Sequence, residues 1–235
     1  MLNPIPQFLQ KMFFTALPFL ISNSVVVVFW SALWIWWIND YAWYPRGTEL
    51  EMLHMAFTSI FLYKVFFWLV LTNLIVLAIT HMKKKKYKIA GNILFLAILF
   101  YALVGLYTNK KCASHWYCVF LNQSVPEESI TRPILEAGYS IGPILTEAIM
   151  DKDLKFRGYA IIGLTEIKYS PTIEIIGGIL LDKTENEIFR KIVYYHLHSF
   201  NTKETRKILE DFRRQTVDTL DKEVIRDENG HDIFL

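Results

Sequence analysis

The sequence predicts an all-α protein in two parts, with three membrane-spanning helices followed by a small domain of packed helices. Three observations predict this arrangement. Apolar residues concentrate before residue 108, whereas charged residues crowd the part of the chain that follows. Three of the apolar runs are long enough to cross a bilayer as helices. After residue 124, sequence signals for helix starts recur at short intervals.

The three apolar runs cover about residues 13–38, 55–80 and 89–107. A hydrocarbon core of about 30 Å needs roughly 20 apolar residues in a helix, and each run meets this length. Each run is also too long for a buried strand. We do not expect the first run to be a signal peptide, because the "NDYAWYPRG" that follows it offers no small-residue cleavage site. We therefore expect residues 1–108 to form a transmembrane domain in a lipid bilayer.

The orientation of this domain is predicted from its lysines, because short loops rich in Lys and Arg stay in the cytoplasm. The turn between the second and third runs carries Lys83, Lys84, Lys85, Lys86 and Lys88. The loop between the first two runs carries one arginine against three acidic residues. The sequence thus predicts a multi-pass protein of the inner (cell) membrane, with a cytoplasmic N-terminus and an extracytoplasmic C-terminal domain. Lys110 and Lys111 give a weaker signal in the opposite direction.

Lys64 is the only charged residue inside a predicted span. An ionisable side chain in a span is a candidate functional group. Because Lys64 lies in the outer third of its span, we expect its ammonium group to reach the headgroups. A role in transport or in charge pairing is the alternative, although no predicted span carries an acidic partner for it.

A connector, residues 109–125, holds both cysteines of the chain, Cys112 and Cys118. In an oxidising compartment they could close a small disulfide loop, which is the expectation that follows from an exported C-terminal part. The alternative is two unpaired thiols near the bilayer. A zinc site would need four ligands, and only His115 lies nearby.

The C-terminal part, residues 126–235, is predicted to be a water-soluble helical domain. Helix start and stop signals place its helices at about 126–137, 142–150, 154–167, 171–181, 185–199 and 203–225. Thr184 with Glu187 has the spacing of a capping box, and Ser170 precedes a proline at a helix start. The tail around 224–234 could form a short hairpin or fray.

An internal repeat organises this domain. The stretch "FRGYAIIGL" begins at Phe156, and the similar stretch "FRKIVYYHL" begins at Phe189. An acidic turn precedes each copy, and a new helix follows each copy. A period in the thirties built from helix pairs is typical of a stacked α-solenoid, in which each pair buries its apolar face against its neighbour.

The stretch "GPILTEAIMDKDLKFRGYAIIGLTEI" resembles a HEAT-type repeat, and the resemblance covers about residues 139–212. Such repeats carry a proline early in the first helix, an aspartate in the turn and an arginine in the second helix. The matching residues are Pro143, Asp153 (or Asp151) and Arg157 in one unit, and Pro171, Asp182 and Arg190 in the next. The prolines depart from the pattern, because they lie closer together than the two arginines do. A small helical bundle with two similar helices is the alternative.

No group of residues in the sequence indicates catalysis, so we expect a protein that is not an enzyme and that uses no cofactor or metal ion. His196 and His198 are two residues apart on a predicted helix and therefore point to different sides. Neither a nucleophile elbow nor a glycine-rich phosphate loop is present. The formal net charge of +2 gives no reason to expect a nucleic-acid partner.

The resemblance to HEAT-type repeats implies a protein-binding module. The chain is therefore expected to be an anchor or accessory subunit of an envelope complex. Helical phase suggests Lys155, Lys191, Tyr194 and His198 as residues of the interaction surface. Two other functions fit the same pattern. One is an immunity protein that blocks a membrane-targeted toxin. The other is a channel-like effector that forms a homo-oligomer, with the soluble domain as its sensor.

Overall fold

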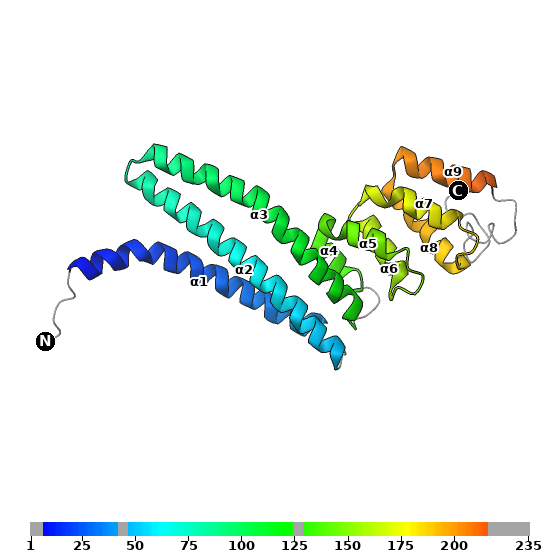
Figure 1. Ribbon diagram of the computed structural model, residues 1–235, viewed down its shortest axis with the longest axis horizontal. Coiled ribbons are helices and arrows are strands. Elements are labelled where there is room, and N and C mark those ends of the chain that lie inside the picture. Colours follow the sequence, from blue (N-terminus) through cyan, green and yellow to red (C-terminus); the bar gives the residue numbers. More distant parts are fainter. Residues whose placement is uncertain (1–6, 42–46, 125–128, 216–235) are drawn as a thin grey trace. The chain divides into compact units, whose positions relative to one another are not determined.

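The computed structural model describes residues 7–41, 47–124 and 129–215, with side chains for all of these except 7–13 and 215. Every regular element in these ranges is helical (Figure 1). The chain divides into two compact units, Met1–His115 and Trp116–Leu235. The predicted all-α fold, with three long apolar helices followed by shorter ones, is thereby confirmed.

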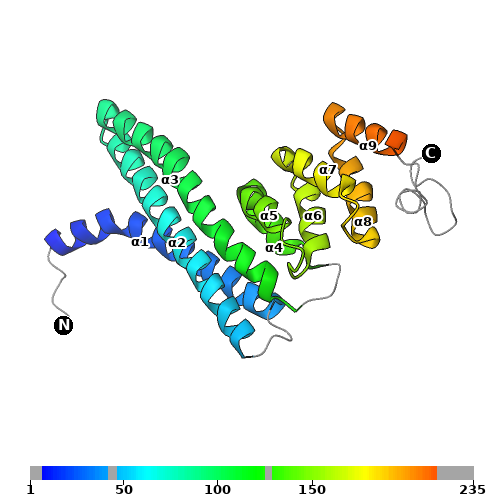
Figure 2. The same ribbon diagram turned by 45° about the vertical axis from the view of Figure 1, so that its right-hand side comes forward.

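The first unit is built from two long helices and most of a third, and all three are apolar and long enough to cross a membrane. They are α1 (Gln7–Tyr41), α2 (Thr48–Lys83) and α3 (Tyr87–Asn122). Helices α2 and α3 form an antiparallel hairpin, and α1 lies beside the N-terminal half of α2 (Figures 1 and 2). Each helix of the hairpin has 36 residues. At about 1.5 Å per residue each is about 54 Å long, which exceeds the roughly 30 Å of a hydrocarbon core.

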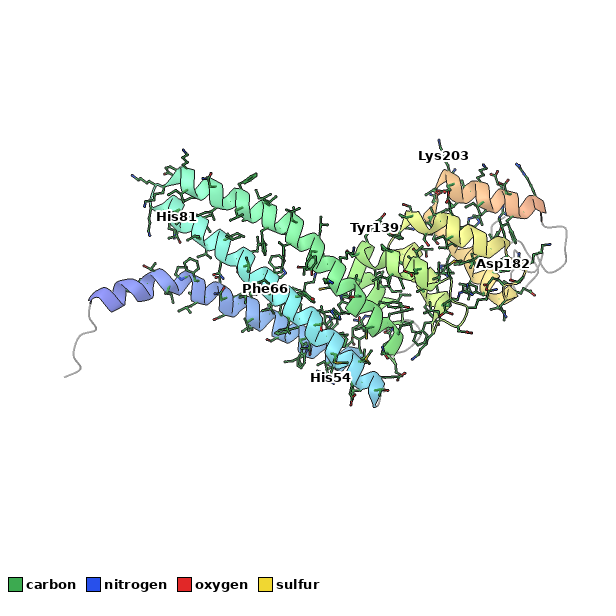
Figure 3. The ribbon with its side chains drawn as sticks, viewed as in Figure 1. His54, Phe66, His81, Tyr139, Asp182 and Lys203 are labelled. Atoms are coloured by element: carbon green, nitrogen blue, oxygen red, sulfur yellow. The ribbon has the colours of Figure 1, made fainter. Side chains whose placement is uncertain are left out.

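Burial changes along the hairpin. In the C-terminal half of α2 only Phe67, Leu71 and Ala78 are buried, while large apolar side chains such as Phe66 project outward with 67% of their surface exposed (Figure 3). Phe67 stacks on Phe100 of α3 with ring centroids 5.5 Å apart, and this contact holds the two helices together. The exposed apolar surface of this half is what a lipid-facing segment requires.

The opposite end of the unit has a conventional core. Trp37 and Tyr41 at the end of α1 pack on Phe57 of α2, with ring centroids 5.9 and 5.6 Å away. Leu53 and Ile60, one turn to either side on α2, are fully buried. A dense aromatic core therefore joins α1 to the N-terminal half of α2.

Helix α3 continues through most of the predicted connector. The structure is helical to Asn122, so residues 109–122 do not form the expected loop. The physical reason is that neither glycine nor proline occurs between Leu106 and Val125, and nothing else there breaks a helix. The buried residues of this extension recur at helical spacing, which is the signal that could have predicted it: Cys112, Ala113, Trp116, Val119 and Phe120.

The second unit consists of short helices arranged as stacked pairs. After α4 (Arg132–Ala137) come α5 (Gly142–Ala148) with α6 (Arg157–Glu166), then α7 (Ile173–Leu181) with α8 (Glu187–Leu197), and finally α9 (Lys203–Gln215). Helix α6 packs on α8, and α7 packs on both α8 and α9, so two layers form (Figure 2). Short 3-10 turns precede α5 (Gly138–Ile141) and α7 (Ser170–Thr172) and follow α8 (His198–Phe200).

These helices lie where the sequence predicts them, but the caps differ. The expected capping box of Thr184 and Glu187 is wrong, because the Asn186 side chain accepts from the Phe189 N–H and caps α8. A reciprocal box forms before α9 instead, where Thr202 and Thr205 each accept from the other's backbone N–H. The start of the helix predicted at 126, the end predicted at 225, and the tail hairpin lie outside the described residues.

Glycines permit two close approaches between helices. A Cβ atom on Gly163 of α6 would overlap the Ile134 Cδ1 atom of α4. A Cβ atom on Gly177 of α7 would lie 3.0 Å from the Ile208 Cδ1 atom of α9. Gly178, the neighbour of Gly177, has open space beside it. The stack therefore depends on glycine at specific positions and not on glycine in general.

Replacing Gly163 by alanine is expected to lower the free energy of unfolding by about 1 to 3 kcal/mol, because the fully buried Ile134 must move. The matched control is Gly178→Ala, which fills open space and should be neutral or stabilising by up to about 1 kcal/mol. Urea-dependent pulse proteolysis of the full-length protein in detergent measures both. Equal effects of the two substitutions would contradict the packing described here.

Candidate interaction surface

Two arginines perform the same task in successive helix pairs. The Arg157 Nε donates to the Ile149 carbonyl, 2.7 Å away, just past the end of α5. The Arg190 Nε donates to the Leu180 carbonyl, 2.8 Å away, near the end of α7. Each guanidinium thus neutralises the carbonyl end of the first helix of its own pair.

Each arginine also reaches the next helix. The Arg157 guanidinium lies 4.1 Å from the ring centroid of Phe189 on α8. The Arg190 guanidinium lies 5.5 Å from the ring centroid of Phe212 on α9. These cation–π contacts repeat along the stack. Lys168 and Asn201 are separated along the sequence by the same distance as Arg157 and Arg190. Both have the left-handed backbone conformation. Lys168 lies after α6, and Asn201 lies after the 3-10 turn that follows α8.

The prolines and aspartates of the repeat lie at helix starts and in the turns between helices. Pro143 lies at the start of α5, and Pro171 lies at the start of the 3-10 turn before α7. The Asp182 carboxylate accepts from the N–H two residues on, at Thr184. In the preceding unit Asp151, and not Asp153, has this role, since Asp151 accepts from the Asp153 N–H. The HEAT-type resemblance itself stays a prediction.

Glu185 links the two helix pairs. Its carboxylate accepts two hydrogen bonds from Arg157, at 2.8 and 3.2 Å, and lies 3.1 Å from the Lys152 ammonium group. The Glu185 side chain is only 4% exposed, and hydrogen bonds from Arg157 hold its pKa below the ordinary value. Lys152 also pairs with Asp182 at 3.7 Å (Asp182 is labelled in Figure 3). Hydrogen bonds from Thr184 lower the pKa of Asp182. This ion network fixes one pair against the next.

Helix α8 presents a largely apolar stripe on the side opposite its buried residues Val193, Tyr194 and Leu197. Its members recur at helical spacing and line a shallow hollow of about 290 Å³: Ile188, Lys191, Ile192, Tyr195 and His196. Ile188 is 72% exposed and Tyr195 is 51% exposed. Burial lowers the pKa of His196, so this imidazole is neutral at neutral pH and adds no charge to the stripe. We call these five residues the α8 stripe.

The structure places the predicted surface residues differently. Tyr194 is fully buried and its hydroxyl accepts from the Arg213 Nε at 2.7 Å, so its assignment to the surface is wrong. The repeat carried a signal for this burial, because Tyr194 aligns with Ile161 of α6, which is fully buried too. Lys191 belongs to the α8 stripe. Lys155 is exposed before α6, and His198 begins the 3-10 turn after α8.

The predicted disulfide is not formed, since neither Cys112 nor Cys118 is bonded to another cysteine. Cys112 and Cys118 lie six residues apart on the continuous helix α3. Six residues span about 9 Å of helix axis, whereas a disulfide needs Cα atoms closer than about 7 Å. The expectation rested on a loop between the cysteines, and the helix removes it.

The lysines of the α2–α3 hairpin lie at two different positions along its helices. All five lysines in and beside the turn between α2 and α3 are exposed, and Lys85 has the left-handed backbone conformation. Lys64 lies far from this turn on α2 and donates to the Asn109 Oδ1 of α3 at 2.8 Å. The sequence pointed to Lys64 but not to its partner on the other helix.

Neither a cluster of metal ligands among the described residues nor a similarity to known proteins indicates an activity for this chain. Within residues 7–41, 47–124 and 129–215, no three His, Cys, Asp or Glu side chains converge as metal ligands would. Comparison with protein-family models, curated proteins and solved structures finds no match to this chain.

Replacing Glu185 by glutamine is expected to lower the free energy of unfolding by about 2 to 4 kcal/mol, because the partly buried Arg157 loses its counter-ion. The matched control is Glu210→Gln, which removes an exposed ion pair with Arg214 and should cost less than about 1 kcal/mol. Denaturant unfolding of the full-length protein at pH 7 compares the two. A loss no larger than that of the control would contradict a structural role for the network.

The same network predicts the pH dependence of stability. Because the folded-state pKa of Glu185 is below its ordinary value, its contribution is complete above about pH 4.5 and is lost as the pH falls through the folded-state pKa. Stability of the native chain should therefore decline as the pH falls below about 4.5. In Glu185→Gln the decline should be shallower, with a remainder due to Asp182, whose pKa is shifted in the same direction.

Proposed function

We propose that this protein is a membrane-anchored, non-catalytic subunit that binds another envelope protein through the α8 stripe. The observation that carries the proposal is that α8 is apolar on two sides. Its inner side buries Val193, Tyr194 and Leu197 in the core. Its outer side leaves Ile188 and Tyr195 more than half exposed. One apolar side suffices to hold a helix in a stack, so the second is available to a partner.

The shape of the α8 stripe supports a protein partner over a small ligand. The hollow is shallow, and its five residues come from one helix. Small-molecule sites are usually deep and enclosed, with convergent polar groups. A tyrosine flanked by isoleucines is typical of the centre of a protein interface. The partner should therefore offer an apolar side chain that fits between Ile188 and Tyr195.

The topology belongs to the same proposal. The five lysines of the turn after α2 favour a cytoplasmic turn, which leaves the N-terminus inside and the C-terminal unit outside the cytoplasm. The support is the charge asymmetry alone, because without a disulfide the two cysteines give no evidence for an oxidising compartment.

Photo-crosslinking tests the partner. With p-benzoylphenylalanine in place of Tyr195, irradiation of intact membranes should give one discrete adduct with a second protein. The same residue in place of Glu174, which is exposed on α7, should not. Adding Ile188→Asp should reduce the adduct at least about tenfold, as expected when an interface anchor is lost. An adduct equally strong from position 174 would contradict the proposal, and an adduct with a second copy would favour a homo-oligomer instead.

Reporter fusions test the topology. Alkaline phosphatase fused after Leu235 should be active, because that enzyme matures only outside the cytoplasm, whereas a fluorescent protein fused there and exported unfolded should be dark. The control is a fusion within the lysine turn after Lys85, which should show the opposite pattern. Fluorescence at Leu235 would reverse the proposed orientation.

A further inference from the structure

A cavity of about 510 Å³ lies between α2 and α3 within the first unit. From α2 it is lined by Lys64, Phe67 and Trp68. From α3 it is lined by Tyr101, Ala102, Gly105, Leu106, Thr108 and Asn109. The polar groups gather at the Lys64 end, while the rest of the wall is apolar. The cavity is thus amphipathic along the direction of the helices.

The level of this cavity in the membrane follows from distances along the helices. Lys64 is separated from Lys83, and Asn109 from Lys88, by roughly 20 residues of helix, which at about 1.5 Å per residue correspond to about 30 Å. Both separations match the roughly 30 Å of a hydrocarbon core. With the lysine turn at one membrane boundary, Lys64 and Asn109 lie at the other, where lipid headgroups begin.

Lys64 has no counter-ion in the described part of the chain. Its hydrogen-bond partner is the neutral Asn109 amide, and no carboxylate of the described residues lies within ion-pair distance. The acidic residues nearest to it along α2 are Glu49 and Glu51, which lie several helical turns away. An ammonium group has three donors, so two remain beyond the bond to Asn109. A cation at the edge of hydrocarbon without a counter-ion is costly, and an anion supplied by the bilayer would lower this cost.

We propose that this cavity binds one anionic phospholipid in the leaflet opposite the lysine turn. The Lys64 ammonium group and the Asn109 amide would hold the headgroup phosphate. Lys110 and Lys111, which follow Asn109 directly, add positive charge at the same level. Small residues at Ala102 and Gly105, opposite the rings of Phe67 and Trp68, leave room for an acyl chain. This assignment is independent of the α8 stripe.

Native mass spectrometry of the full-length protein in mild detergent tests the proposal. Titration with dioleoylphosphatidylglycerol should show one tightly bound lipid, with dioleoylphosphatidylcholine bound more weakly. Lys64→Gln should weaken phosphatidylglycerol binding about tenfold, the loss expected for one hydrogen bond to a charged group. Lys64→Arg should retain most of it. Lys86→Gln, which removes the same charge from the exposed turn, is the control and should leave it unchanged.

A second variant keeps the charge and fills the groove. A Cβ atom on Gly105 would make only an ordinary contact with the Phe67 ring, at 3.5 Å, and the rest of the side chain of Gly105→Leu would enter the cavity and block the acyl-chain path. Circular dichroism of this variant checks that it is folded. The substitution should lower affinity for phosphatidylglycerol although Lys64 is intact. Equal affinity for the two lipids, or equal losses in Lys64→Gln and Lys86→Gln, would overturn the proposal. Unchanged binding in Gly105→Leu would overturn the placement of the acyl chain in this cavity.

Discussion

The energetic cost of placing a lysine ammonium group in hydrocarbon is the constraint on which the membrane part depends. It places charged residues at two levels of the α2–α3 hairpin, the exposed turn around Lys85 and the level of Lys64 and Asn109. Between these levels the helices expose large apolar side chains, as lipid contact requires. On the other side of Lys64, towards the start of α2, Phe57 packs under Trp37 and Tyr41 of α1 in a core of buried aromatic side chains.

The second unit uses charge in the opposite way, by burying it. Arg157 and Arg190 each bind carbonyls at the end of a helix and stack on an aromatic ring of the next one. Burying a guanidinium is costly unless its N–H donors find partners, and here each guanidinium has a backbone carbonyl and an aromatic ring beside it. The repeated arginine therefore specifies how one helix pair meets the next, and Glu185 makes the first junction more rigid than hydrophobic packing alone would.

The sequence predicted the features that depend on local pattern. Apolar runs long enough to span a bilayer located α1 to α3, and the repeat that relates Arg157 to Arg190 located two equivalent helices. The failures have physical causes too. Adjacent tyrosines at 194 and 195 differ by only about 100° around the helix, so an error of one residue in phase reverses their burial. Two contacts join residues that are far apart in sequence, Glu185 with Arg157 and Lys64 with Asn109. A local sequence pattern cannot predict such contacts.

The small size of the α8 stripe bears on why the chain would be anchored at all. Five residues of one helix form only part of a standard protein interface, and small interfaces bind weakly in free solution. Confinement of both proteins to one membrane raises their effective concentration, so that a weak contact becomes persistent without additional buried area. On the proposed function, the three apolar helices therefore contribute to affinity as well as to localisation, and the partner should itself be attached to the membrane.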